Sequence, residues 1–192
     1  MVWSKFSKRV RITGGSWKSR RFKPMKSFKG RPTTDFAREG LFNLLRSRVD
    51  LDEAKVLDLF AGTGMVGIEC ASRGAASIVA VEKNRQASSY IKSCYKELGF
   101  ESAVVLNQDA FTFLKRSAEM PSVVYDLVFA DPPYKIDGME TIPSLVQKAK
   151  LVAEDGLLVL EHGAENSFEG EPGYVETRRY GHVNFSFFNF ES

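Results

Sequence analysis

Four consecutive residues, Asp131-Pro132-Pro133-Tyr134, combine the groups needed to hold a flat ring that carries an amino group. They follow an apolar run over residues 126–130, which predicts a buried strand of a parallel sheet. Ligands of α/β proteins bind at the carboxyl ends of such strands, so we expect this loop to lie where chemistry takes place. It offers a carboxylate, a rigid backbone carbonyl and a flat aromatic surface.

This set of groups suits methyl transfer to an amino group of a nucleobase, which is a poor nucleophile because its lone pair is delocalised into the ring. The Asp131 carboxylate and the Pro132 carbonyl would accept hydrogen bonds from the two N–H groups of the amino nitrogen. They would thereby favour the pyramidal nitrogen of the transition state. Tyr134 would stack on the base, while Pro132 and Pro133 would stiffen the loop. We therefore predict that these four residues are catalytic. In the structural alternative, the prolines end a strand and Asp131 caps the next segment.

A second motif, residues 56–64, reads as a strand that runs into a glycine turn and then a helix. Gly62, Gly64 and Gly67 also satisfy the Gly-x-Gly-x-x-Gly pattern of dinucleotide sites, a weak match by itself. Asp58 favours S-adenosylmethionine (SAM) instead, because a carboxylate just before the turn suits a cationic amino acid better than a pyrophosphate. The predicted cofactor residues of this segment are Asp58, Phe60, Ala61, Gly62, Thr63 and Gly64.

Further cofactor contacts are expected after the next two strands. Glu82 closes the strand 77–82, where a carboxylate can accept hydrogen bonds from both ribose hydroxyls of either NAD or SAM, and Lys83 follows it. Asp109 is similar to the acidic residue that other SAM enzymes place near the adenine amino group, and Ala110 would add backbone polarity. Asp109 could equally be the N-cap of a helix over 109–118, and the two roles are compatible.

Charge is distributed unevenly along the chain, whose total is only +3. Residues 1–50 hold fourteen basic and three acidic side chains, a net charge of +11, and the remainder carries −8. Aromatic residues are interleaved with this basic segment, a pattern typical of phosphate contacts beside stacking surfaces. The alternative is a solvated extension that its aromatics pin to the domain. The predicted RNA contacts from this segment are Arg11, Lys18, Arg20, Arg21, Lys23 and Arg31.

Strands and helices alternate from residue 55 onward, which predicts a doubly wound α/β sheet. We expect strands at 55–60, 77–82, 103–107, 125–130 and 157–161, and helices near 65–73, 84–98, 109–118 and 140–153. Residues 174–180 and 183–190 read as a closing antiparallel hairpin, so the sheet has seven strands. A parallel sheet finished in this way is the arrangement of SAM methyltransferases. Near the N-terminus we expect a hairpin with a Gly14-Gly15 turn, followed by a helix that begins at Thr34 or Asp35.

Length and composition set broader limits. With 192 residues and 43% hydrophobic content, the chain can bury a sizeable core in one domain plus a short appendage. Its apolar stretches are only strand-length and no signal-peptide pattern is present, so we expect a cytoplasmic protein. Cys70 and Cys94 are expected to be buried thiols, and no metal site is predicted.

Together these motifs resemble the RsmD family of methyltransferases, which modify N2 of a guanine in 16S ribosomal RNA. The resemblance rests on Arg11-Ile12-Thr13-Gly14-Gly15-Ser16-Trp17-Lys18, on Arg31-Pro32-Thr33-Thr34-Asp35 with Arg38-Glu39-Gly40-Leu41-Phe42-Asn43, and on the two motifs described above. It implies SAM as cofactor and 16S rRNA as substrate, within the 30S subunit or an assembly intermediate. It also implies that Thr34 lies near SAM and that Arg38 contacts RNA.

We also expect an RNA-binding arm over residues 1–31, a methyltransferase domain over 32–192, and a monomer. Ser19 and Phe36-Ala37 depart from the family pattern, which affects the expected RNA affinity more than methyl transfer.

Other hypotheses stay open. A DNA adenine-N6 methyltransferase could use the same tetrapeptide, although such enzymes usually carry a further recognition domain. A non-catalytic RNA-binding factor for ribosome assembly could keep the fold as a platform. A nicotinamide oxidoreductase is the remaining alternative, since it would use the glycine turn.

Overall fold

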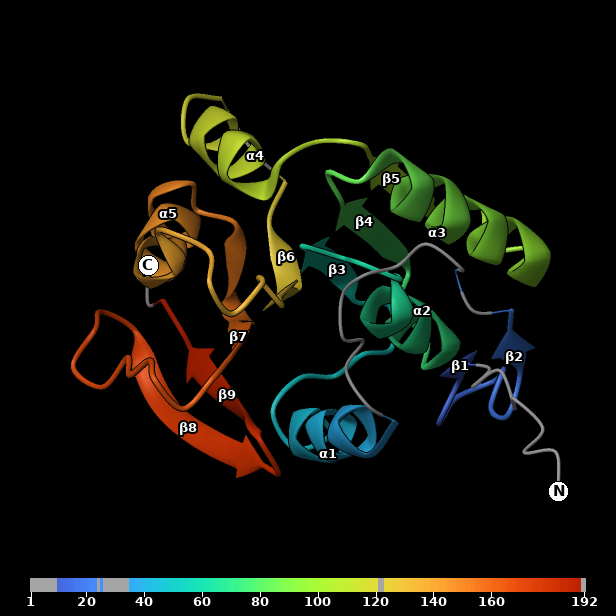
Figure 1. Ribbon diagram of the computed structural model, residues 1–192, viewed down its shortest axis with the longest axis horizontal. Helices are drawn as coiled ribbons and strands as arrows, with labels where there is room; N and C mark the ends of the chain where they lie inside the picture. The colour runs from blue at the N-terminus through green and yellow to red at the C-terminus, as the bar shows by residue number, and fades with distance from the viewer. Residues whose placement is uncertain (1–9, 24, 26–34, 121–122, 191–192) are drawn as a thin grey trace, which may run out of the picture.

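The computed structural model describes residues 10–23, 25, 35–120 and 123–190. Its main sheet has seven strands in the order β5-β4-β3-β6-β7-β9-β8 (Figure 1). The strands are β3 (Lys55–Leu59), β4 (Ser77–Val81), β5 (Ala103–Leu106), β6 (Tyr125–Ala130), β7 (Val152–His162), β8 (Tyr174–Tyr180) and β9 (Val183–Phe188). The first five are parallel, and β9 and β8 close the sheet as an antiparallel hairpin. This topology confirms the predicted fold class.

Five α-helices of the described chain cover the two faces of this sheet (Figure 1). The helices α1 (Asp35–Leu45), α2 (Met65–Ser72) and α3 (Arg85–Leu98) contribute to the hydrophobic cluster on one face. On the other face, α4 (Ala110–Ser117), α5 (Ile142–Lys148) and the short 3₁₀ helix η1 (Met139–Thr141) line a second cluster. No described helix is long and apolar enough to cross a membrane.

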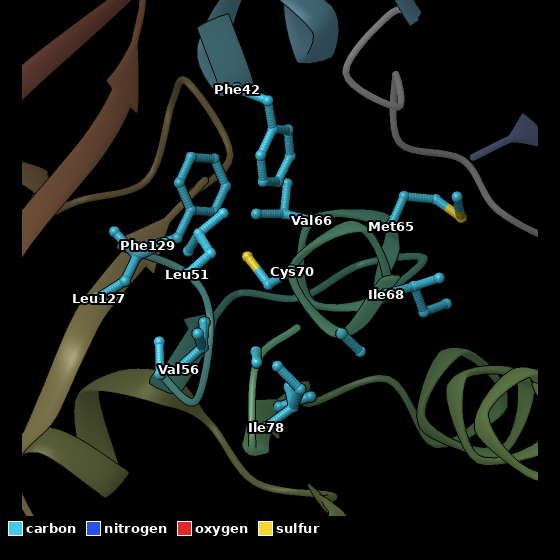
Figure 2. Packing of buried hydrophobic residues seen from close by; sticks show 14 of the residues in the cluster. Phe42, Leu51, Val56, Met65, Val66, Ile68, Cys70, Ile78, Leu127 and Phe129 are labelled. Atoms are coloured by element: carbon cyan, nitrogen blue, oxygen red, sulfur yellow. The ribbon is translucent and has the colours of Figure 1, made fainter. Parts of the chain in front are cut away.

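Alternation along the buried strands builds both clusters. In β6, Leu127 and Phe129 point into the α1–α3 side, while Val128 and Ala130 point to the α4–α5 side. Figure 2 shows Phe42 of α1 and Val66 of α2 close to Phe129. The loop after β6 therefore extends from a strand that is fixed by packing on both faces.

Local signals in the sequence set the ends of α3 as expected. Asn84 caps its first turn, because its side chain accepts hydrogen bonds from the backbone N–H groups of Gln86 and Ala87 at 2.9 and 3.0 Å. Gly99 ends the helix in the left-handed conformation, with φ of 69°. The predicted buried thiols are confirmed too, since Cys70 and Cys94 are free and buried.

The predicted helix over 140–153 was wrong at its C-terminal end. α5 stops at Lys148, and Lys150 takes φ of 50°, so the chain turns and enters β7 at Val152. Val152 pairs with Tyr125, and the register then shifts before Leu127 pairs with Leu157. Because of this bulge, β7 begins at Val152, inside the range that helical periodicity had assigned to the helix.

The N-terminal hairpin is also built differently from the prediction. β1 (Val10–Arg11) and β2 (Arg21–Phe22) pair over two residues each, and residues 12–20 form the connection. Gly14-Gly15 is not a two-residue turn; it docks against the C-terminal end of α2. A Cβ atom on Gly15, where φ is 75°, would lie 1.8 Å from the carbonyl oxygen of Ser72. Gly15 therefore allows a close approach of two backbones, while Gly14 leaves room for the Arg73 side chain.

Candidate active site

A cavity of about 380 Å³ opens at the carboxyl ends of β3, β4 and β6. This size lies within the usual range of small-molecule sites. The predicted residues that line it are Arg38, Asp58, Phe60, Ala61, Gly62, Thr63, Glu82, Lys83, Ala110, Asp131, Pro132, Pro133 and Tyr134. The structure thus brings the glycine turn and the Asp131–Tyr134 loop to one cavity.

The glycine turn owes its shape to left-handed backbone conformations. Phe60, Gly62 and Gly64 have φ of 57°, 55° and 71°. Phe60 is the strained member, since its side chain makes this conformation costly, and its ring packs edge-on against Phe111. Gly64 does not line the cavity. It is the N-cap residue before α2, and a Cβ there would lie 2.8 Å from Ile91.

Asp58 lies in β3 beneath this turn and is only 2% exposed. Burial raises its pKa from 3.8 to about 7, partly offset by a hydrogen bond from the backbone N–H of Gly67, and the nearby charge of Glu82 raises it further. A buried carboxylate of this kind gains most from a cationic partner. Its position at the cavity fits the predicted contact with an amino acid cation.

Glu82 directly follows β4, and each of its two carboxylate oxygens accepts a hydrogen bond from a backbone N–H group. The N–H of Gly62 donates to Oε2 at 2.8 Å, and the N–H of Asn84 donates to Oε1 at 2.6 Å. These bonds tie the end of β4 to the glycine turn after β3. The carboxylate therefore borders the cavity in a fixed orientation, as a ribose contact requires.

Asp109 is the N-cap residue of α4, which was one of the two roles predicted for it. Its Oδ1 accepts hydrogen bonds from the backbone N–H and the hydroxyl of Thr112, at 3.0 and 3.3 Å. The side chain is not part of the cavity lining, whereas Ala110 is. A contact between Asp109 and adenine stays a prediction.

The Asp131–Tyr134 loop leaves β6 beside the end of β3, where the N–H of Asp131 donates to the carbonyl of Leu59 at 3.4 Å. The carbonyl of Pro133 accepts a bond from the N–H of Ile136. Within the described part of the chain, the Pro132 carbonyl receives no such bond. Pro132 is buried, whereas Tyr134 is 42% exposed and presents its ring at the cavity mouth.

Arg38 lies in a buried network of charges instead of on the surface. Its side chain is 1% exposed and donates to the carbonyl of Arg11 at 2.5 Å and to Asp35 at 2.8 Å. Its Nε lies 3.5 Å from Oε2 of Glu69, which is fully buried in α2. Glu69 also accepts hydrogen bonds from the backbone N–H and hydroxyl of Thr13. In this conformation Arg38 borders the cavity and is not placed for surface phosphate contacts.

The other predicted RNA contacts lie on or beside the hairpin. Lys18, Arg20, Arg21 and Lys23 are exposed. Arg11 is partly engaged, because its guanidinium lies 2.9 Å from Glu39 and 3.7 Å from Asp35. Arg31 and Thr34 lie outside the described residues, as does the predicted domain boundary at residue 31.

Several site residues were missed by the sequence analysis. Met65, Val66, Val81 and Phe129 supply apolar lining, and the sequence analysis had placed them only within predicted strands and a predicted helix. Glu161 was missed although it ends a predicted strand, which is where functional side chains gather. Its buried carboxylate accepts a bond of 3.4 Å from the Tyr134 hydroxyl.

Comparison with known proteins places this site in a family. A family model described as "Conserved hypothetical protein 95" matches residues 10–189. Ribosomal RNA small subunit methyltransferase D of Escherichia coli (strain K12) is 33% identical over 166 residues, which cover 86% of this chain and 81% of the relative. The chain belongs to the RsmD family.

Other relatives of this RsmD-family chain agree with the assignment. The putative rRNA methyltransferase YlbH of Bacillus subtilis (strain 168) is 34% identical over 157 residues, covering 81% of this chain and 84% of YlbH. A solved structure of the putative methyltransferase yhhF from Escherichia coli superposes with a TM-score of 0.81 at 30% identity. That match covers 96% of this chain and 99% of the other. The RsmD-family fold thus extends over nearly the whole chain.

Proposed function

We propose that this RsmD-family chain transfers a methyl group from SAM to the exocyclic N2 amino group of a guanine in 16S ribosomal RNA. One observation carries the proposal: the Asp131–Tyr134 loop and the Asp58–glycine-turn segment face the same cavity. A donor of methyl groups and an acceptor amino group could therefore meet there.

The residues present fit SAM by their chemistry. Asp58 provides a buried carboxylate for the cationic amino acid end, and Glu82 provides a fixed carboxylate for the ribose. Val81 and Ala110 give apolar surface suited to a flat ring. SAM bound there supplies a methyl group on a positively charged sulfur, which needs no further activation.

The chain's own groups would act on the amino nitrogen. The Asp131 carboxylate and the Pro132 carbonyl accept hydrogen bonds from the two N–H groups of this nitrogen. These bonds localise the lone pair for in-line attack and stabilise the positive charge that develops on nitrogen. The proton then leaves to Asp131 or to water. Tyr134 stacks on the base and fixes its plane. A guanine in a helix must first be extruded from its stack to reach this cavity.

The relatives' names support ribosomal RNA as the substrate class. The exposed basic side chains of the hairpin, Lys18, Arg20, Arg21 and Lys23, support a polyanionic partner. Guanine N2, the 30S subunit or an assembly intermediate as the particle, and action as a cytoplasmic monomer are finer parts of the proposal.

Tritiated methyl transfer to under-methylated 30S subunits, followed by nucleoside analysis, tests the proposal. The parent should form N2-methylguanine, and Asp131→Ala should lower the rate by about 10²–10³, the usual effect of removing one such contact. Asp137→Ala, an exposed carboxylate in the following turn, is the matched control.

Other products would identify the competing hypotheses. Methylation of adenine in DNA would favour the DNA enzyme. Normal binding to subunits without methylation of any substrate would favour the assembly factor. Absence of N2-methylguanine contradicts the proposal.

A further inference from the structure

The turn between β8 and β9 lies at the same edge of the sheet as the Asp131–Tyr134 loop. β7 runs parallel to β6, with Ala130 opposite Leu160, so both strands end at this edge. β9 is antiparallel to β7 and begins beside its end, with Asn184 opposite His162. The tip of the hairpin, where Tyr180 pairs with Val183, therefore lies at the same edge of the sheet, with β7 between the hairpin and β6.

A series of contacts, most of them between aromatic rings, links the Asp131–Tyr134 loop to this tip. Tyr134 bonds to Glu161, which is paired with Phe185 of β9. The rings of Phe185 and Tyr180 are 6.2 Å apart, and the rings of Tyr180 and Phe36 are 6.4 Å apart in an edge-to-face arrangement. The series thus runs from β6 across β7, β9 and β8 to the first turn of α1.

The two ends of this series face solvent. Phe36 is 68% exposed and Tyr134 is 42% exposed. Tyr180 between them is fixed by α1, because Gly40 leaves room for its ring: a Cβ on Gly40 would lie 2.4 Å from it. Single exposed aromatics are common on protein surfaces. A second exposed ring on a rigid support, at the same edge of the sheet as Tyr134, offers a platform for another base.

A cation accompanies these rings. Arg179 is exposed and precedes Tyr180 in β8, so its side chain leaves the opposite face of the strand. Its Nε donates to the carbonyl of Gly181 at 3.1 Å, which brings the guanidinium to the tip of the hairpin. Among the described residues no carboxylate lies within 4.0 Å of its guanidinium. Its neighbour Arg178 differs, since it is paired with Glu176. Arg179 is therefore available for a phosphate.

We infer that Phe36, Tyr180 and Arg179 bind the single-stranded RNA that flanks the target base. A neighbouring base stacks on Phe36 against the edge of Tyr180, and Arg179 contacts a backbone phosphate. Extrusion of the target leaves the adjacent bases partly unstacked, so an aromatic surface at the same edge of the sheet as the cavity recovers part of the lost stacking. The inference deepens the proposed function and rests on it for the identity of the RNA.

Five variants of the full chain, Phe36→Tyr among them, separate this surface from general effects. Phe36→Ala and Arg179→Ala remove the platform and the cation. Val175→Ala, a 56% exposed side chain at the opposite end of β8, and Arg116→Ala, an exposed arginine on α4, are the matched controls. Each variant is titrated with a single-stranded fragment of small-subunit rRNA at several salt concentrations, and with S-adenosylhomocysteine.

Phe36→Ala should weaken RNA binding at least about fivefold, the lower end of the effect of losing one stacked base, and Phe36→Tyr should restore it. Arg179→Ala should reduce the slope of log affinity against log salt by about 0.7, one phosphate contact on a single strand. Binding of S-adenosylhomocysteine should stay within about twofold of the parent value, since neither residue lines the cavity. The inference is overturned if both variants match their controls. It is also overturned if the parent sediments as a dimer and Phe36→Ala weakens this dimer without changing the affinity for RNA.

Failure of the proposed function has a different signature. A parent that binds the RNA and loses affinity through Phe36→Ala, yet forms no N2-methylguanine, contradicts the proposed reaction and leaves the RNA surface supported. A parent that methylates guanine while both variants bind like their controls contradicts the surface alone.

Discussion

The backbone N–H of Gly67 donates a hydrogen bond of 3.1 Å to Oδ2 of Asp58, which joins the first turn of α2 to the central strand β3. This bond favours the charged carboxylate, but burial outweighs it and raises the pKa of Asp58 to about 7. The protein without ligand therefore holds Asp58 close to the midpoint of its titration at neutral pH.

Stability should depend on pH through Asp58. Its pKa in the folded state, about 7, exceeds the ordinary 3.8, so the folded state retains a proton that the unfolded state releases. The free energy of unfolding contributed by this group falls as pH rises from 4 to 7 and is level above 7. Asp58→Asn should remove this fall. The unfolding free energy of the variant minus that of the parent should therefore rise by roughly 4 kcal/mol from pH 4 to pH 8. Urea unfolding of both proteins at several pH values measures it; parallel profiles would contradict the pKa.

Binding of S-adenosylhomocysteine should show the opposite trend. Its cationic amino group favours the charged form of Asp58, so affinity should rise as pH increases through 7, while the amino group is still protonated. The Asp58→Asn variant should bind more weakly and without this rise. Calorimetric titration between pH 6 and 8 makes the comparison. A parent whose affinity is flat over this range would show that the amino group does not contact Asp58.

The ring and the hydroxyl of Tyr134 should contribute separately. Tyr134→Phe keeps the stacking surface and removes the hydroxyl with its 3.4 Å bond to Glu161, so we expect single-turnover methyl transfer to fall by no more than about fivefold, the cost of one modest hydrogen bond. Tyr134→Ala also removes the stack and should cost about 10²-fold, the usual effect of misplacing a reacting group. Equal rates for the two variants would exclude a stacking role.

Removal of Glu69 should destabilise the fold strongly. Glu69→Ala leaves the buried guanidinium of Arg38 without one carboxylate and Thr13 without its acceptor, so we expect a loss of about 3–5 kcal/mol in unfolding free energy. Glu97→Ala, which removes an exposed carboxylate 4.0 Å from Arg20, is the control, and it should cost less than about 1 kcal/mol. Similar losses in the two variants would contradict the role of burial.

The sequence allowed the sheet and the two main motifs to be predicted because their signals are local. Apolar runs bounded by glycines located the strands, and Asn84 and Gly99 set the ends of α3. Asp58 and Asp131 were identified because each lies at or near the end of a buried strand. Strand ends are also what a doubly wound sheet brings together, so one cavity followed from topology.

Contacts between distant segments could not be predicted. The burial of Arg38 depends on Glu69 in another helix, and the position of Gly15 depends on the carbonyl of Ser72. The start of β7 depends on pairing between Val152 and Tyr125, which competes with helical periodicity in residues 149–153. Such features are fixed by partners in tertiary structure and leave no periodic signal of their own.

The anchoring of the hairpin has a consequence for modularity. Thr13 supplies hydrogen bonds to a carboxylate in the interior, and Ile12 and Phe22 are part of the core beneath it. The hairpin is therefore not an appendage that could be trimmed or exchanged between relatives on its own. A graft that gave another methyltransferase the same basic surface would have to include Arg38 and Glu69 together with the loop. The buried polar groups of all three are paired with one another, so none can be moved alone without depriving another of a partner.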